Sequence, residues 1–297
     1  MTMNLKAELL LDSRAALGEG PIWDERRQLL YWVDIVDGKL NAYDPVANEN
    51  QVYDVGQHVG TVVPTNNHNK VMLAVYEGFG VYDLEAKELR ILADPEAHLP
   101  QNRFNDGKCD PNGRFWAGTM ALEDQSDQGS LYCLDRDLNV RKVLGDIGIS
   151  NGLAWSLDGT VMYFIDSKAF AVTAFDFDLE SGTVSNERIV TAVPEEMGAP
   201  DGMTIDDEGM LWVAHWGGSR VCRWHPENGA LLQTIELPVS QTTACAFGGK
   251  ELDTLYITSA RVGLSTKQLQ LEPHAGGLFA VKTGCRGVLA YRFDSRV

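Results

Sequence analysis

Short segments rich in aromatic and β-branched residues recur along the whole chain, and each follows a polar turn. Such segments lie at 29–35, 114–120, 161–167, 210–216 and 254–260. Aromatic and β-branched residues are enriched in strands, and turns built from Asp, Asn and Gly close hairpins. No helical periodicity extends beyond a turn or two. The pattern therefore predicts an all-β protein.

These segments belong to a unit that occurs six times, with starts 41 to 50 residues apart. The units begin at Glu19, Gly60, Asn105, Asn151, Asp201 and Thr243. A second set of apolar segments alternates with the first, at 39–45, 79–92, 129–135, 171–178, 220–226 and 276–282. A repeat of this length with four short strands is typical of a β-propeller. We predict a six-bladed β-propeller, with four-stranded antiparallel blades around a central channel.

The two ends of the chain are expected to close the ring. Residues 6–14 precede the first unit, residues 287–293 follow the sixth, and both segments have the composition of strands. A blade that shares N-terminal and C-terminal strands would leave no exposed sheet edge at the junction. No Pro-rich linker or low-complexity tract interrupts the chain, so residues 1–297 are expected to form a single domain.

Composition excludes several classes of partner. Hydrophobic residues make up 44% of the chain and charged residues 23%, as in ordinary globular proteins. The formal net charge of −17 opposes binding to nucleic acid and to anionic membrane surfaces, because both need clustered Lys and Arg. We therefore expect neither nucleic acid nor membrane as a partner, and we take a monomer as the default.

The chain also lacks the signals of export. No apolar run approaches the roughly 18 residues of a membrane span, and the N-terminus lacks the basic and apolar regions of a signal peptide. The five cysteines have no CxxC spacing, which disfavours a disulfide framework and a zinc–thiolate site. We expect a cytoplasmic protein whose cysteines are buried as small apolar residues.

Polar residues followed by glycine open four of the six units. Glu19, Asn151 and Asp201 each precede a glycine, and Asn105-Asp106-Gly107 is a variant of this pattern. A single Asn-Gly or Asp-Gly pair is usually a hairpin turn. Here the hairpin signals come several residues later, for example at 110–113, so the recurrence needs another explanation. Closure of the ring would bring these side chains to one axis.

One Glu, one Asn and one Asp supply oxygen ligands and two negative charges. Such a set suits a divalent cation and leaves coordination positions for water or substrate. We therefore predict that Glu19, Asn151 and Asp201 bind one metal ion, which could be Ca²⁺, Zn²⁺, Mg²⁺, Mn²⁺ or Fe²⁺. The six histidines lack HxxxH spacing and the serines lack a GxSxG motif, so a histidine zinc site or a serine nucleophile has no support.

Four motifs resemble the SMP-30/gluconolactonase/regucalcin family, and the likeness covers nearly the whole chain. The motifs are LGEGPIWD, RFNDGKCDPNGRFWAGTM, SNGLAWSLDGTVMYF and PDGMTIDDEGMLWVAHWGG. The resemblance implies that the family's metal ligands correspond to Glu19, Asn151 and Asp201. The segment 272–287 is similar to bacterial members that act in pentose and hexose oxidation.

The same resemblance implies that Arg103, Asn105 and Glu123 contact the substrate. Arg103 would hold hydroxyls or the carbonyl, and a surface ion pair is its alternative role. Asn105 would orient substrate or complete the metal shell. Glu123 would lie in a loop that caps the channel, or would be a solvated carboxylate. His215 and Trp216 follow an inner strand and are weaker candidates, with Trp216 able to stack on a sugar face.

The resemblance implies metal-dependent hydrolysis of a sugar lactone, an aldono-1,4- or 1,5-lactone such as xylono-, arabino-, galactono- or gluconolactone. A lactone is a cyclic ester, so its hydrolysis needs an activated water and a group that stabilises the oxyanion. Asp201 is the candidate general base, with a role as ligand only as the alternative. A calcium-binding regulatory propeller without catalysis and a hydrolase of other esters or organophosphates also remain open.

Overall fold

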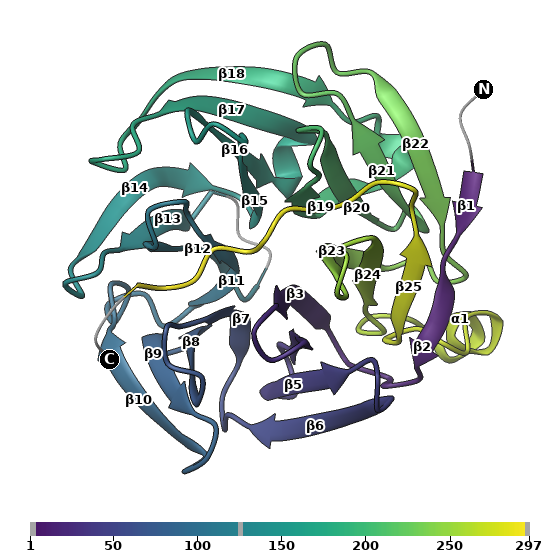
Figure 1. The fold of residues 1–297 in the computed structure, drawn as a ribbon, viewed down its shortest axis with the longest axis horizontal. Helices are drawn as coiled ribbons and strands as arrows, with labels where there is room; N and C mark the ends of the chain where they lie inside the picture. The colour runs from purple at the N-terminus through teal and green to yellow at the C-terminus, as the bar shows by residue number, and fades with distance from the viewer. Residues whose placement is uncertain (1–3, 124–126, 295–297) are drawn as a thin grey trace.

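Six small antiparallel sheets stand around a common axis in the computed structural model, which describes residues 4–123 and 127–294 (Figure 1). The predicted six-bladed β-propeller is confirmed. Within the first four blades the strands follow one another in chain order, and in all six blades the first strand of each repeat unit is the innermost. Inner strands of neighbouring blades contact each other around the ring.

The first four blades each consist of four consecutive strands. Blade 1 contains β3 (Gly18–Asp24), β4 (Leu29–Asp34), β5 (Lys39–Asp44) and β6 (Glu49–Asp54). Blade 2 contains β7 (Val59–Pro64), β8 (Lys70–Val75), β9 (Gly78–Asp83) and β10 (Glu88–Ala93). Blade 3 contains β11 (Asn102–Cys109), β12 (Phe115–Ala121), β13 (Gly129–Leu134) and β14 (Val140–Ile147). Blade 4 contains β15 (Ser150–Trp155), β16 (Val161–Asp166), β17 (Ala171–Phe177) and β18 (Val184–Ala192).

The last two blades take in the N-terminal strands. Blade 5 contains β19 (Ala199–Ile205), β20 (Leu211–Trp216), β21 (Arg220–Trp224), β22 (Leu231–Glu236) and the added parallel strand β1 (Asn4–Lys6). Blade 6 contains β23 (Thr242–Gly248), β24 (Thr254–Ser259), β25 (Leu278–Lys282) and β2 (Glu8–Leu11). The described helical segments are short, namely α1 (Thr266–Leu271), η1 (Ser167–Ala169) and η2 (Glu195–Met197).

N-terminal and C-terminal strands close the ring in one blade, as predicted, because β2 pairs antiparallel with β25. The C-terminal partner, however, is 278–282 and not the expected segment 287–293. Strand β2 already occupies the outer edge of β25, so residues 287–293 cannot pair with that strand. The addition of β1 to blade 5 was not anticipated either.

Residues 287–293, called the C-terminal strap below, instead cross the propeller from blade 6 toward blades 2 and 3, in yellow at the front of Figure 1. At one end Gly287 N–H donates to Leu252 O (2.8 Å), and at the other Phe293 N–H donates to Pro64 O (2.9 Å). Phe293 is fully buried. The strap therefore joins two blades that are not neighbours in the ring.

Helices are short and cysteines are unpaired in the described part of the chain. None of the helices in this part of the chain is long and apolar enough to cross a membrane. All five cysteines are free thiols, and four of them are buried while Cys285 is partly exposed. They therefore pack as small apolar side chains, as predicted.

Buried aspartates hold the repeated turns between the first and second strands of the blades. The carboxylate of Asp206 accepts hydrogen bonds from Met210 N–H (2.9 Å), and also from Trp212 Nε1 (2.8 Å) and Arg223 Nε (2.7 Å). Asp110 plays the same part in blade 3. Each carboxylate joins a turn to a core tryptophan and an arginine, which explains why the motif recurs in the sequence.

Replacement of Asp206 by Ala is expected to destabilise the protein by about 3 kcal/mol, because buried donors would lose their acceptor. For a chain of this size that loss corresponds to a decrease in Tm of roughly 5–10 °C. Thermal unfolding followed by circular dichroism measures it. Asp207→Ala is the matched control, since the Asp207 side chain is exposed. Equal Tm values for the two variants would show that this carboxylate network contributes no stability.

Candidate active site

All six innermost strands break their pairing register close to their first residues. The break lies between Ser150 and Leu153 in β15, and between Pro200 and Met203 in β19. A β-bulge of this kind leaves residues unpaired and re-aims their side chains. Asn151 and Asp201 lie within such bulges, and Glu19 lies directly before one. All three lie at one end of the channel.

The glycines that follow these residues have a structural reason. Gly20 has a φ of +52°, a conformation that residues with a Cβ rarely adopt. A Cβ on Gly202 would lie 2.3 Å from the Cβ of Ala244 on the next inner strand. These glycines therefore allow the inner strands of neighbouring blades to lie close together.

A cavity of about 370 Å³ opens at this end of the channel. Five of the six predicted site residues line it, although they come from four different blades: Glu19, Arg103, Asn105, Asn151 and Asp201. Glu123 is not among the lining residues. It is exposed and follows Leu122, which does line the cavity. The structure thus brings together all the predicted metal ligands but leaves Glu123 outside the group.

The predicted metal ligands are almost completely buried, with exposed fractions of 4% for Glu19, 3% for Asn151 and 5% for Asp201. Asn151 Nδ2 donates to Ser167 Oγ (3.0 Å), and this hydroxyl donates to Pro200 O (2.7 Å). The amide oxygen of Asn151 and Oδ1 of Asp201 have no hydrogen-bond partner in the described part of the chain. Buried oxygens without a donor are costly, and a cation would satisfy both.

The electrostatics of the site favour a cation. Burial raises the pKa of Glu19 well above its usual value, and the nearby carboxylates of Asp201 and Asp106 raise it further. Burial and the Asp106 carboxylate likewise raise the pKa of Asp201. Like charges in a poorly solvated channel repel one another, so bound positive charge would stabilise their ionised forms. The donor set therefore fits a divalent cation.

An amide ligand is essential to this interpretation. Within residues 4–123 and 127–294, no three His, Cys, Asp or Glu side chains gather as a metal site would require. Glu19 and Asp201 supply two carboxylates, and the third oxygen has to come from Asn151. The chemistry of the set, with oxygen donors only, is that of a site for hard or borderline cations.

Arg103 lies beside this group, and Asn105 holds it there. Arg103 Nη1 donates to Asn105 Oδ1 (2.7 Å) and to Phe104 O (3.0 Å), while Asn105 Nδ2 donates to Ser150 O (2.9 Å). No ion pair between described residues includes Arg103. Burial lowers the pKa of Arg103 to about 10, and the carboxylates of Glu19 and Asp201 oppose that shift.

Sequence reasoning missed several polar residues near the site. Ser167 orients the amide of Asn151, and His58 lines the cavity, where burial and Arg103 lower its pKa. Deeper in the channel, Lys108 Nζ donates to Met203 O (2.6 Å). Asp106 occupies the position at which other units have glycine, a departure visible in the sequence. That break in the repeat could have identified Asp106.

The two weaker candidates on β20, His215 and Trp216, lie in different surroundings. Trp216 lines the cavity, but His215 is fully buried and stacks on Trp224 with ring centroids 6.2 Å apart. His215 therefore makes no contact with a ligand in the cavity. Side chains of successive strand residues point to opposite faces, so only one of this pair can face the site. Burial lowers the pKa of His215 to about 4, and Arg220 contributes.

This burial predicts a loss of stability in acid. An unfolded histidine binds a proton near pH 6.5, whereas folded His215 stays neutral down to about pH 4, so the unfolded state gains more protons in this window. Stability should therefore decrease by about 3 kcal/mol between pH 6.5 and pH 4 through this residue alone. Urea unfolding of His215→Phe should show a weaker pH dependence than the wild type. His68→Gln, at an exposed position, should show the wild-type dependence; equal slopes for all three proteins would contradict the assignment.

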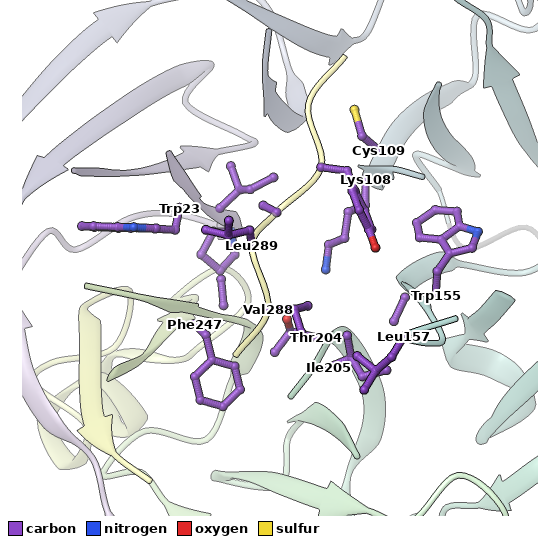
Figure 2. A pocket seen from close by; sticks show the side chains of 16 residues that line it. Trp23, Lys108, Cys109, Trp155, Leu157, Thr204, Ile205, Phe247, Val288 and Leu289 are labelled. Atoms are coloured by element: carbon purple, nitrogen blue, oxygen red, sulfur yellow. The ribbon is translucent and has the colours of Figure 1, made fainter. Parts of the chain in front are cut away.

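The other end of the channel is covered by the C-terminal strap. A second cavity of about 50 Å³ lies beneath it, and Figure 2 shows Val288 and Leu289 of the strap passing between Trp23 and Trp155. Phe247 also lines this cavity, so most of its wall is apolar. The predicted metal ligands Glu19, Asn151 and Asp201 do not line this cavity. The candidate site is therefore the cavity at the opposite end.

Comparisons with known proteins agree with this architecture. Residues 17–261 match the family model described as SMP-30/Gluconolactonase/LRE-like region. Regucalcin from Oryctolagus cuniculus is 41% identical over 98% of this chain and 99% of that protein. The putative sugar lactone lactonase YvrE from Bacillus subtilis (strain 168) is 40% identical over 94% of this chain and 95% of that protein.

Solved structures show the same fold over the whole length. A luciferin-regenerating enzyme superposes with a TM-score of 0.92 at 33% identity, covering 97% of this chain and 99% of that chain. A regucalcin from Agrobacterium tumefaciens, described as a calcium-binding protein, superposes with a TM-score of 0.93 at 28% identity and 98% coverage of both chains.

Proposed function

The chain belongs to the SMP-30/gluconolactonase/LRE-like family, and on this premise we propose that it hydrolyses a sugar lactone to the aldonic acid with one bound divalent cation. One observation carries the proposal. Buried Asn151 and Asp201 oxygens that have no hydrogen-bond partner among the described residues lie in the same cavity as Glu19 and Arg103. A binding module has no need of a partly buried arginine beside an oxygen-rich cation site in a cavity open to small molecules.

Glu19, Asn151 and Asp201 would hold the cation. When bound, a divalent cation lowers the pKa of a water ligand and polarises a carbonyl group. The residues themselves account for the charge balance, since two carboxylates offset the charge of the ion. Ca²⁺ is the first candidate because the Agrobacterium relative is described as calcium-binding, and Zn²⁺, Mg²⁺, Mn²⁺ and Fe²⁺ suit the same oxygens.

Asp201 would act as the general base. It accepts a proton from the attacking water, whose oxygen bonds to the carbonyl carbon of the lactone. The bond between that carbon and the ring oxygen then breaks, and the proton passes to the ring oxygen, which becomes the hydroxyl of the aldonic acid. Burial and the Asp106 carboxylate raise the pKa of Asp201, and a higher pKa makes a carboxylate a stronger base.

Arg103 would bind the lactone through its remaining N–H groups. Among the described residues, Asn105 and the Phe104 carbonyl accept hydrogen bonds from Nη1 alone, so the other guanidinium donors can bind the carbonyl or ring hydroxyls of a substrate. An aldono-1,4- or 1,5-lactone, such as xylono-, arabino-, galactono- or gluconolactone, would offer several such acceptors. Asn105 would position the arginine, and Glu123 would contact substrate from the adjoining loop.

Arg103→Ala is expected to lower kcat/KM by about 10- to 100-fold, chiefly through KM, because hydrogen bonds from a charged donor to the substrate are lost. The metal content should stay at the wild-type value, since Arg103 is not a ligand. Steady-state kinetics and elemental analysis of the purified variant measure the two quantities. Arg90→Ala is the matched control at an exposed position of β10. Loss of the metal in Arg103→Ala would contradict this separation of roles.

Acid release from a panel of pentono- and hexonolactones, followed with a pH indicator, tests the proposal. We expect hydrolysis well above the background rate for at least one lactone when the protein carries a divalent cation. Regucalcin relatives make a calcium-binding propeller without catalysis the second candidate. Tight Ca²⁺ binding without turnover of any lactone would favour that function instead.

A further inference from the structure

Exposed apolar side chains surround the mouth of the candidate cavity. Val36, Leu122 and Val262 line it with exposed fractions of 42%, 44% and 40%. They come from three blades: Val36 lies between β4 and β5, Leu122 follows β12, and Val262 follows β24. Single exposed apolar residues need no explanation, but residues from separate blades that meet at one cavity mark a binding surface.

The apolar surface continues inward toward the buried polar groups. Met120, Ile149 and Trp216 line the cavity and are partly buried, and Leu17 is buried beside Glu19. The cavity wall is therefore apolar at the mouth, which we call the rim, and polar at the buried end with Glu19, Asn151 and Asp201, which we call the floor. A ligand that fits this gradient has a polar reacting group at one end and an apolar substituent at the other.

Several polar groups of the cavity are already paired within the protein. The Asn105 amide is engaged by Arg103 and Ser150, and the Ser167 hydroxyl donates to Pro200 O. These two groups are therefore less available to the ring hydroxyls of a sugar. An aliphatic group placed there would lose no hydrogen bond and would remove apolar surface from water.

The substituent can extend in one direction only. The C-terminal strap covers the far end of the channel, where Val288 and Leu289 pass over its axis (Figure 2). Lys108 and Asp106 lie between that end and the floor. A lactone ring on the floor must therefore direct its substituent along the apolar wall toward Leu122 and Val36.

We propose a second substrate class, which rests on the function proposed above: lactones that carry a short alkyl chain, such as γ-alkyl-γ-butyrolactones. The lactone group would lie against Arg103 and Asp201, and the chain would lie on Met120, Leu122 and Val36. Water adds its oxygen to the carbonyl carbon, the bond to the ring oxygen breaks, and the ring oxygen takes up the proton. The product is a 4-hydroxy acid, and no other reactant is needed.

A homologous series tests this proposal, because its members share the reacting group and differ only in apolar surface. We would measure kcat/KM for γ-butyrolactone, γ-valerolactone, γ-hexalactone and γ-octalactone, with one aldonolactone as reference, using metal-loaded protein. The expected result is an increase of about two- to fourfold per added methylene, the range set by partial to full burial of the group.

Variants at the mouth of the cavity test whether its apolar residues cause the increase in kcat/KM with chain length. The double variant Val36→Ser/Leu122→Ser should flatten the dependence of kcat/KM on chain length, measured relative to its own rate with the aldonolactone. Both positions are exposed, so the fold should be kept, which Tm verifies. Leu271→Ser, at an apolar residue of α1 with an exposed fraction of 74%, is the matched control and should keep the wild-type slope.

The outcomes separate the two proposals. A wild-type protein that hydrolyses the aldonolactone but shows no increase along the alkyl series would overturn the second substrate class and leave the proposed function standing. An alkyl slope that survives in the double variant would overturn the assignment to this wall. A protein that hydrolyses no lactone of either kind would overturn both proposals.

Discussion

Asp201→Ala should abolish lactone hydrolysis while the propeller stays folded. The residue lies in a β-bulge at the end of the channel, outside the ladder that holds blade 5 together. Its loss would remove one carboxylate of the cation site and the candidate base, and either role alone is worth about 10²–10⁴ in rate. We therefore expect kcat to fall at least 10³-fold with an unchanged circular dichroism spectrum. Near wild-type turnover would refute the assignment.

The companion variant Asp201→Asn distinguishes the two roles of this residue. It keeps an oxygen that can bind a cation but removes the negative charge and the ability to take up a proton. Loss of turnover with the metal retained would identify Asp201 as the base. Loss of both turnover and metal would identify it as a ligand. Asp207→Ala, exposed in the next turn, should keep full activity.

Glu19→Gln should weaken the stabilisation that a bound cation gives by at least a third. Ligand binding stabilises the folded state by about 4 kcal/mol at 1,000 times Kd, and loss of one of two carboxylate ligands should raise Kd by at least tenfold, which leaves about 2.7 kcal/mol at the same cation concentration. Differential scanning fluorimetry with and without added Ca²⁺ or Zn²⁺ measures the shift in Tm. Glu77→Gln, at an exposed carboxylate, is the control. An undiminished shift in Glu19→Gln would exclude Glu19 as a ligand.

Without a bound metal, the effect of Glu19→Gln on the stability of the protein should be reversed. The pKa of Glu19 is raised in the folded state, because burial and neighbouring carboxylates disfavour its charge. The folded protein therefore holds a proton that the unfolded chain releases above about pH 4.3, and stability falls as the pH rises toward the folded pKa. Glu19→Gln lacks this group, so its metal-free form should be at least as stable as metal-free wild type at neutral pH.

The repeat made the blades predictable, whereas the ends of the chain were not. Six in-phase units specify six inner strands, because each unit has the same turn and the same core positions. Residues 287–293 have the composition of a strand but form the strap, since a strand needs a free sheet edge and β2 occupies that of β25. The availability of an edge depends on the whole ring and cannot be read from a local pattern.

The site was predictable to the extent that it follows the repeat. Glu19, Asn151 and Asp201 occupy equivalent positions in three blades, so ring closure alone brings them together. His215 differs, because a shift of one residue along β20 moves a side chain from the cavity to the core. Glu123 lies in a loop outside the repeat, so the spacing of the six units does not predict where this residue lies. Pairing of Asn105 with Arg103 likewise depends on side-chain geometry that spacing does not contain.

The most direct test of the central claim is lactone hydrolysis by metal-stripped protein as a divalent cation is added back in known equivalents. We expect almost no activity without metal, a linear increase in activity as metal is added, and saturation at one ion per chain. Glu19→Gln should require a large excess of metal for the same activity. Full activity in protein verified to be free of metal, or saturation unaffected by Glu19→Gln, would contradict metal-dependent hydrolysis at this site.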